Sequence, residues 1–216
     1  MICHVATRGN RRQAVYLHDA DRLNFLDVLH HITAEHQWNL LSYCLMGNHY
    51  HLVVEVPDGD LATGMHRLNS TYARRFNERH GFAGHLFEKR YWSDDLEQEE
   101  RLLAAIGYVG RNPVRAGFCE RAADWVWSSA GAAMGDRRCP AYLNLTRLWD
   151  LVAPTHAAAQ SRLRQMYDEE VLPPLEALRE AIKRHVSRAH HGDGLSVHEV
   201  AEALQLSTTS VLKLMR

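Results

Sequence analysis

Residues 38–56 read WNLLSYCLMGNHYHLVVEV and contain two apolar runs that are separated by Gly47 and Asn48. Apolar, β-prone runs on both sides of a glycine-asparagine pair are typical of two strands joined by a tight hairpin turn. We therefore predict strands over residues 38–46 and 49–56, and we expect the other elements to assemble around this hairpin.

The second strand of the hairpin separates its side chains by type. Because successive side chains of a strand point to opposite faces of the sheet, His49 and His51 share one face. The other face is apolar and carries Tyr50, Leu52, Val54 and Val56. Core helices are expected to cover the apolar face, which leaves the histidine face available for a functional site.

Helix and strand signals alternate along the first half of the chain. They predict a strand over 2–8, a helix over 19–36, the two hairpin strands, a helix over 60–79, a short strand over 85–92 and a helix over 96–110. The acidic run 93–100 is interpreted as the start of the last helix, with Ser93 as its N-cap. This order indicates an α+β fold, a ferredoxin-like antiparallel sheet with helices packed on one face.

The composition is that of an ordinary globular protein: the 216 residues are 46% hydrophobic and 24% charged, with a net charge of -1. A nucleic-acid partner would therefore be recognised by local clusters of basic residues and not by the charge of the whole chain. The four cysteines show no CxxC spacing, and no signal-like or membrane-length apolar run occurs. We expect a reduced, cytoplasmic protein without a membrane segment.

Basic residues do cluster in two places. One is the TRGNRRQ segment at residues 7–13, and the other is residues 66–92, in which basic and aromatic side chains are mixed. Such a mixture can follow a phosphate backbone and stack on bases. The alternative interpretation of residues 66–92 is an amphipathic helix with a solvated basic face, followed by a core strand.

The His49-Tyr50-His51 sequence is compatible with a metal site but is not sufficient for one. A chain with 15 histidines contains about one such His-x-His pair by chance, so the motif alone is weak. A strand holds two such imidazoles about 6–7 Å apart, close enough to share one ion. Two nitrogens leave a divalent cation undersaturated, and a third protein ligand is therefore required.

Tyr108 and Asn112 are the candidates for completing such a site. They are four residues apart, so they share a face if the helix continues that far. Pro113 disfavours helical geometry at the residue before it, and we expect Asn112 at or just past the last turn. The alternative is that Tyr108 is a core or capping aromatic and that Asn112 starts a turn.

Five segments of the chain together resemble one known family. They are TRGNRRQAVY, DRLNFLDVL, YCLMGNHYHLVVEVP, ARRFNERHGFAGHLFEKRY and YVGRNPVRAGF. This set is similar to the single-tyrosine HUH transposases, and in particular to the group associated with repetitive extragenic palindromes (REP) in bacterial chromosomes. HUH stands for two histidines separated by a bulky hydrophobic residue. The resemblance covers residues 2–130.

The resemblance implies an HUH endonuclease fold and assigns roles to particular residues. His49 and His51 match the paired histidines, Tyr108 matches the catalytic tyrosine, and Asn112 falls where the family supplies a third metal ligand. Similar proteins bind hairpin-forming single-stranded DNA and cut and rejoin it through a 5′-phosphotyrosine intermediate, with Mg²⁺ or Mn²⁺. The candidates for DNA contact are then Arg8, Asn10, Arg11, Arg12, Arg74, Arg75, Lys89, Arg90 and Arg115.

The residue types fit that chemistry on independent grounds. Imidazole nitrogens with an amide oxygen suit Mg²⁺ or Mn²⁺ with open positions for substrate oxygens. A tyrosine nucleophile would conserve the energy of the phosphodiester in a covalent bond, so the strand could be rejoined without ATP. A structural zinc site formed by His49, His51 and Cys44 is the less favoured alternative, because Cys44 lies on the partner strand and no fourth ligand is evident.

Residues 1–130 are therefore predicted to form the catalytic domain, 131–174 a connecting segment and 175–216 a small all-α module. The sequence LSVHEVAEALQLSTTSVLKLMR at 195–216 has the pattern of a helix, a turn and a second helix, as in helix-turn-helix proteins. In that interpretation the module binds duplex DNA. The alternative is a helical bundle that stabilises the catalytic domain.

Two functions from different classes remain. The first is a metal-dependent nickase and strand transferase that acts on hairpin DNA. The second is a non-catalytic regulator that recognises hairpin and duplex DNA. The presence of His49, His51 and Tyr108 together favours the enzyme, because a protein that only binds DNA has no chemical need for all three. The sequence is compatible with a monomer and with a homodimer.

Overall fold

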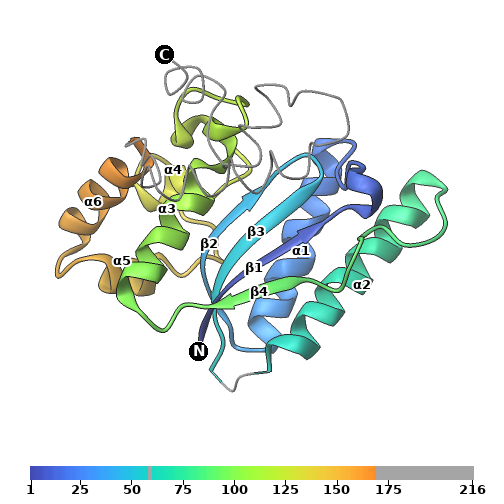
Figure 1. Ribbon diagram of the computed structural model, residues 1–216, viewed down its shortest axis with the longest axis horizontal. Coiled ribbons are helices and arrows are strands. Elements are labelled where there is room, and N and C mark those ends of the chain that lie inside the picture. Colours follow the sequence, from blue (N-terminus) through green and yellow to red (C-terminus); the bar gives the residue numbers. More distant parts are fainter. Residues whose placement is uncertain (58–59, 169–216) are drawn as a thin grey trace, which may run out of the picture.

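Four antiparallel strands form one sheet in the order β2-β3-β1-β4. The computed structural model describes residues 1–57 and 60–168. The predicted antiparallel sheet, its hairpin and the order of strands and helices along the chain are confirmed. Figure 1 shows the sheet between two groups of helices, and its strands are β1 (Ile2–Arg8), β2 (Asn39–Leu45), β3 (His49–Glu55) and β4 (Trp92–Asp95).

Two helices cover one face of the sheet and lie side by side in Figure 1. They are α1 (Asp19–Glu35) and α2 (Leu61–His80). The apolar face of β3 packs against them as predicted: the Tyr50 ring lies 4.6 Å from that of Phe25 on α1, and its hydroxyl donates to Asn69 on α2. The main core is therefore built on the face away from the paired histidines.

The opposite face is also covered, which corrects the prediction of helices on one face only. Helix α3 (Glu99–Arg115) contacts β2 and β3, and its Tyr108 ring lies 5.2 Å from that of His51. The reason lies in the strands, because Val53 and Cys44, on the histidine face, are fully buried as well. Strands with buried side chains on both faces need a covering layer on each.

Strand β4 and the start of α3 differ from the predicted boundaries. The strand spans Trp92–Asp95 and not 85–92, and Ser93 pairs with Val5 of β1 instead of capping a helix. Gln98 occupies the N-cap position of α3. Because β4 is an edge strand with side chains partly in solvent, it can carry charged residues, and a hydrophobic pattern does not reveal it.

The end of α3 lies further along the chain than predicted. The helix continues past Pro113 to Arg115, so Asn112 lies in its last turn, one of the two positions expected for it. The helix ends at a Schellman cap: Gly117 has a φ of 73°, and the Phe118 amide donates to the Pro113 carbonyl at 2.9 Å. Tyr108 and Asn112 are therefore one turn apart on the same helix.

The segment after α3 closes the outer edge of β2. The Leu45 amide donates to the Trp127 carbonyl at 2.9 Å, and the Asn144 amide donates to the Leu40 carbonyl at 2.9 Å. These bonds satisfy backbone groups that an open sheet edge would leave exposed. The elements of the segment are the 3-10 turn η2 (Ala122–Asp124) and the helices α4 (Ala130–Ala133), α5 (Leu145–Val152) and α6 (His156–Asp168).

The structure describes most of the predicted connecting segment, up to residue 168, but not the predicted C-terminal module. Residues 145–168 contact β2 and α3 through α5 and α6. The predicted helix-turn-helix module at 175–216 lies outside the described residues, so this module and the domain limits stay predictions. Within residues 1–57 and 60–168, no helix is long and apolar enough to cross a membrane.

A buried carboxylate joins the start of α1 to the end of α2. Asp21 is 1% exposed; its Oδ2 accepts the backbone N–H groups of Leu17 and His18, both at 2.9 Å, and its Oδ1 accepts from Arg79 at 3.0 Å and from His80 at 2.9 Å. Burial raises the pKa of Asp21, but these hydrogen bonds outweigh burial and hold the pKa below its usual value. The ionised carboxylate therefore stabilises the fold.

We expect Asp21→Asn to lower the free energy of unfolding by about 2–3 kcal/mol, because an amide cannot accept from all four donors. Since the folded pKa of Asp21 is depressed, its contribution is present above the ordinary carboxyl pKa and is lost as the pH falls through the folded value. Chemical denaturation at neutral pH and at acidic pH measures both effects, and the difference from wild type should shrink in acid.

Asp19→Asn is the matched control for this prediction. Asp19 lies in the same helical turn with its side chain 74% exposed, so its replacement should change stability by about 0.5 kcal/mol or less. If Asp21→Asn were as stable as wild type at neutral pH, the stabilising role of this carboxylate would be wrong.

Candidate active site

The turn residue Asn48 fixes how His49 presents its ring. Asn48 Nδ2 donates to the Arg12 carbonyl at 3.0 Å, so its Oδ1 is the atom that lies 2.7 Å from His49 Nδ1. An amide oxygen can only accept, and Nδ1 of His49 therefore carries the ring proton. The lone pair of His49 is then on Nε2, the nitrogen that could bind a metal ion.

His51 is held in a similar way by a residue of the neighbouring strand. Its Nδ1 lies 3.0 Å from Nε2 of His4 on β1, and its ring centroid lies 5.1 Å from that of His49. Nε2 of His51 is buried, and no hydrogen-bond partner for it occurs among the described residues. A buried nitrogen without a partner is costly unless something binds it, so this atom points to a ligand site.

Burial keeps the rings of His4 and His51 neutral. It lowers the pKa of His4 to about 4, although the nearby Asp94 acts in the opposite direction. Burial also lowers the pKa of His51 well below its usual value, and the neighbouring His49 and other basic groups lower it further. A neutral imidazole is the form that binds metal ions.

Tyr108 covers the histidines from α3. Its ring lies 5.2 Å from that of His51 and 5.8 Å from that of His4, both in edge-to-face geometry. The guanidinium carbon of Arg115 lies 5.1 Å from the centre of the Tyr108 ring. The structure therefore brings the predicted tyrosine, one predicted basic residue and the paired histidines together within one chain.

Asn112 follows Tyr108 by one turn of α3 and is partly buried. Within the described residues, no group of three or more His, Cys, Asp or Glu side chains is arranged to hold a metal ion. A metal ion bound by His49 and His51 would therefore need further ligands, such as the Asn112 amide or substrate oxygens. Cys44 pairs directly with His51 in the sheet, and burial raises the pKa of its thiol, which disfavours a thiolate ligand.

The basic loop after β1 is packed against the hairpin turn. The Gly9 amide donates to the Asn48 carbonyl at 2.8 Å. A Cβ at Gly9 would lie 2.2 Å from the Gln13 carbonyl oxygen, so only glycine fits this close approach. The predicted DNA contacts that are held beside the hairpin in this way are Arg8, Asn10, Arg11 and Arg12, of which the last three form the 3-10 turn η1 (Asn10–Arg12).

A cavity of about 460 Å³ lies beside His51 and Tyr108. It lies between α3 and the strands β1 and β4. His4, His51 and Tyr108 line it, together with Trp92, Asp94 and Arg101. His51, one of the paired histidines, and Tyr108 therefore border a space that a ligand could enter.

Comparison with known proteins identifies the family. A family model described as "Transposase IS200 like" matches residues 1–112 of the chain. This chain belongs to the IS200-like transposase family.

Two relatives of this IS200-like transposase agree with the resemblance seen in the sequence. A protein of Haemophilus influenzae strain Rd, named as a REP-associated tyrosine transposase, is 25% identical over 122 residues, which are 50% of this chain and 69% of that protein. A solved REP-associated tyrosine transposase bound to a REP hairpin is 14% identical, with a TM-score of 0.53 over 66% of this chain and 84% of that chain. The predicted similarity is confirmed, and the structural likeness shows the fold.

The remaining predicted DNA contacts of the transposase lie in two separate places. Lys89 and Arg90 are exposed just before β4, and this segment adjoins the basic loop because the Asn10 amide donates to one of its carbonyls at 2.8 Å. Arg74 and Arg75 lie on α2, across the sheet from the histidines, and Arg75 forms an ion pair with α1 at 3.0 Å. Of these two pairs, only Lys89 and Arg90 therefore lie close to the basic loop.

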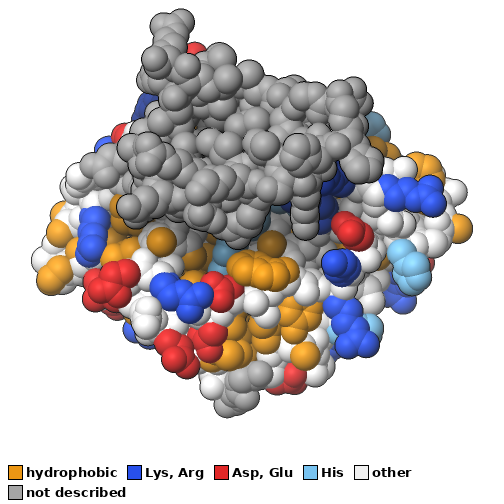
Figure 2. Space-filling view, in the orientation of Figure 1, with side chains coloured by type: hydrophobic (Ala, Val, Ile, Leu, Met, Phe, Trp, Pro, Cys, Tyr) orange, Lys and Arg blue, Asp and Glu red, His pale blue; other side chains and the backbone are white. Residues whose placement is uncertain are grey.

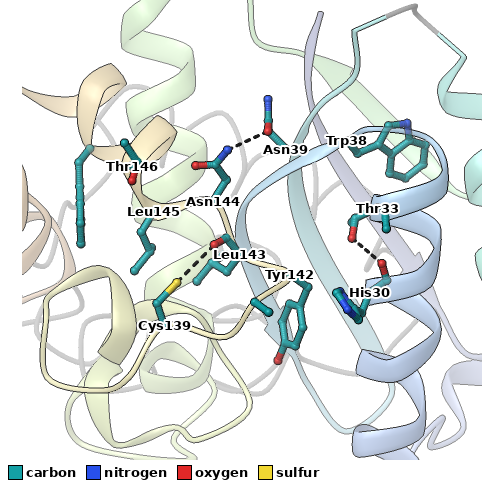
Figure 3. A pocket seen from close by; sticks show the side chains of 13 residues that line it. His30, Thr33, Trp38, Asn39, Cys139, Tyr142, Leu143, Asn144, Leu145 and Thr146 are labelled. Carbon is teal, nitrogen blue, oxygen red and sulfur yellow. Dashed lines mark hydrogen bonds between the residues drawn. The ribbon is translucent and has the colours of Figure 1, made fainter.

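A second cavity of the transposase, of about 390 Å³, lies between α1, β2 and residues 139–149 (Figure 3). Its polar side chains bond within the protein: Asn144 Nδ2 donates to Asn39 Oδ1 at 2.8 Å, and Thr33 Oγ1 donates to the His30 carbonyl at 2.9 Å. None of the predicted catalytic, metal-binding or DNA-binding residues lines it. It is therefore separate from the candidate active site.

Sequence reasoning missed three residues of this transposase site. The antiparallel pairing of β1 with β3 sets Ala6 opposite His51. His4, two residues from Ala6 on the same strand, therefore lies on the histidine face. That strand register is not visible in the sequence. Asn48 is expected only as a turn residue, although it also orients His49. Trp92 is visible only as one aromatic among several in a basic stretch.

Proposed function

We propose that this IS200-like transposase cuts and rejoins hairpin-forming single-stranded DNA, with Tyr108 as the nucleophile and Mg²⁺ or Mn²⁺ as the metal ion. The observation that carries the proposal is the position of Tyr108 beside His51, next to a cavity. A nucleophile, a pair of imidazoles and a space for substrate are the parts that metal-assisted strand cleavage requires.

The atoms of the chain fit a divalent cation. Nε2 of His51 is buried without a partner among the described residues, and the hydrogen bond from His49 to Asn48 leaves the lone pair of His49 on its own Nε2. The side-chain oxygen of Asn112 would be the third ligand, which leaves positions for substrate oxygens. When bound, the ion would polarise the scissile phosphate and stabilise the charge on the leaving 3′ oxygen.

His4 would act as a positioning residue for His51. A metal-binding Nε2 on His51 requires the ring proton on Nδ1, and that proton would be donated to Nε2 of His4 across 3.0 Å. A hydrogen bond of this kind keeps one tautomer and one ring orientation, as the outer-shell partners of metal-binding histidines commonly do. His4 therefore belongs to the site although it touches neither the metal ion nor the DNA in this proposal.

The covalent step would be a transesterification. The Tyr108 oxygen loses its proton and attacks the scissile phosphorus, the bond from phosphorus to the 3′ oxygen breaks, and the 3′ oxygen takes up a proton. The 5′ phosphate then remains on the tyrosine. Rejoining reverses these events, because a 3′-hydroxyl attacks the phosphotyrosine and frees Tyr108 without ATP.

Basic side chains around the tyrosine support a DNA strand as the substrate. Arg115 lies over the Tyr108 ring, and Arg8 ends β1 opposite His49, so both can contact phosphate oxygens near the cut. A hairpin is proposed because a solved protein of this fold is bound to a REP hairpin. The basic loop would then hold the strand that leaves the hairpin.

Incubation with end-labelled hairpin oligonucleotides from the flanks of the gene tests the proposed function. With Mn²⁺ present, we expect one fragment with a free 3′-hydroxyl and a covalent adduct that carries the fragment on the 3′ side of the cut. EDTA should abolish both products. If the hairpins were bound but never cut, with either metal ion, the non-catalytic regulator would be the better explanation.

A further inference from the structure

A half-exposed tryptophan lies beside the candidate active site. Trp92 on the edge strand β4 is 53% exposed, and its ring stands edge-on to that of His4 with the centroids 5.2 Å apart. An exposed large aromatic side chain that borders a cavity offers an apolar face to a ligand. The proposed cleavage step gives Trp92 no role, although this residue borders the same cavity as Tyr108.

The space beside Trp92 is large enough for a ligand of moderate size. The cavity that it shares with Tyr108 has a volume of about 460 Å³, within the range of about 300–1,000 Å³ for small-molecule pockets. Ala104 and Ala105 line it from α3, and their small side chains leave room between this helix and β4. One continuous hollow therefore connects the indole with the tyrosine.

The cavity also has polar groups. Nη2 of Arg101 donates to both carboxylate oxygens of Asp94, at 2.8 and 2.6 Å, and both residues line the cavity with Trp92. Figure 2 shows hydrophobic side chains at the surface over β4, with acidic and basic side chains close by toward the start of α3. An apolar face next to paired donors and acceptors is suited to a flat, polar-edged molecule.

We propose that this cavity holds one nucleobase of the single strand, next to the scissile phosphate and stacked on Trp92. The inference rests on the proposed function, because continuity of the cavity with Tyr108 is what identifies the ligand. A strand whose phosphate lies at Tyr108 has its adjoining bases within reach of the hollow. Each base has a π-face that an indole can stack on, and the Asp94-Arg101 pair can hydrogen-bond to the edge of the base.

Binding measurements on uncut DNA test this pocket. Tyr108→Phe protein with and without Trp92→Ala is titrated with hairpin oligonucleotides from the flanks of the gene, so that cleavage does not interfere. We expect Trp92→Ala to weaken binding on the order of tenfold, and Trp92→Phe to restore most of the loss. Leu23→Ala, at a 60% exposed position on α1 across the sheet, is the control and should leave binding unchanged.

Oligonucleotides with a single abasic position locate the stacked base. At one position next to the cut, the abasic change and Trp92→Ala should weaken binding no more together than either does alone, because both remove the same contact. Additive losses at every position, or unchanged binding by Trp92→Ala, would overturn the pocket. Adduct formation by protein that retains Tyr108 is measured in parallel, so the pocket can fail while strand cleavage persists.

Discussion

Replacement of Tyr108 by phenylalanine is expected to abolish the covalent protein-DNA adduct, with a loss of at least roughly 1,000-fold in the rate of strand cleavage. The substitution removes one oxygen atom and keeps the ring that packs against His4 and His51. Folding and DNA binding should therefore be retained. Single-turnover cleavage of labelled hairpin oligonucleotides measures the effect, and circular dichroism checks the fold.

Tyr142→Phe is the matched control for this substitution. Tyr142 lines the second cavity, which contains none of the predicted site residues, so the variant should cut DNA at the wild-type rate. If Tyr108→Phe cut DNA as fast as this control, another group would be the nucleophile. The role of Tyr108 would then be limited to packing over the histidines.

The second large effect is expected at His51. Its replacement by alanine removes the buried nitrogen that we assign to the metal ion, and metal-dependent cleavage should fall on the order of 100-fold or more. His4→Ala should weaken Mn²⁺ binding by about 10- to 100-fold, because His51 keeps its nitrogen but loses the hydrogen bond that orients it. Isothermal titration calorimetry measures Mn²⁺ affinity independently of cleavage.

His31→Ala provides the comparison for both histidine variants. The His31 side chain is 70% exposed on α1, away from the candidate site, so this variant should bind Mn²⁺ as wild type does. Equal Mn²⁺ affinity for wild type, His31→Ala and His51→Ala would contradict the metal assignment. That result would leave the proposed role of Tyr108 untouched.

The centre of the fold could be predicted because its signals are local. Two apolar runs around Gly47 and Asn48 define the hairpin, and the alternation along β3 separates the histidine face from the apolar face. Strand β4 could not be located correctly, because it is short, polar and recognised only by its pairing with β1. The same polarity made Ser93 resemble a helix cap.

The site could be predicted only where a motif carries it. His49, His51 and Tyr108 follow from their spacing and from the family resemblance, and the structure brings them together. The contribution of His4 depends on strand register and on one hydrogen bond between strands, and no sequence pattern encodes either. The place of Trp92 beside the cavity likewise depends on where β4 begins.

The most direct test of the proposed mechanism is to determine where the DNA becomes attached. Wild-type protein is incubated with a hairpin oligonucleotide and Mn²⁺, the adduct is digested with nuclease and protease, and the modified peptide is sequenced by mass spectrometry. We predict a single nucleotide-bearing phosphate on Tyr108. Attachment to a different residue, or no adduct under conditions in which the oligonucleotide is bound, would contradict the mechanism.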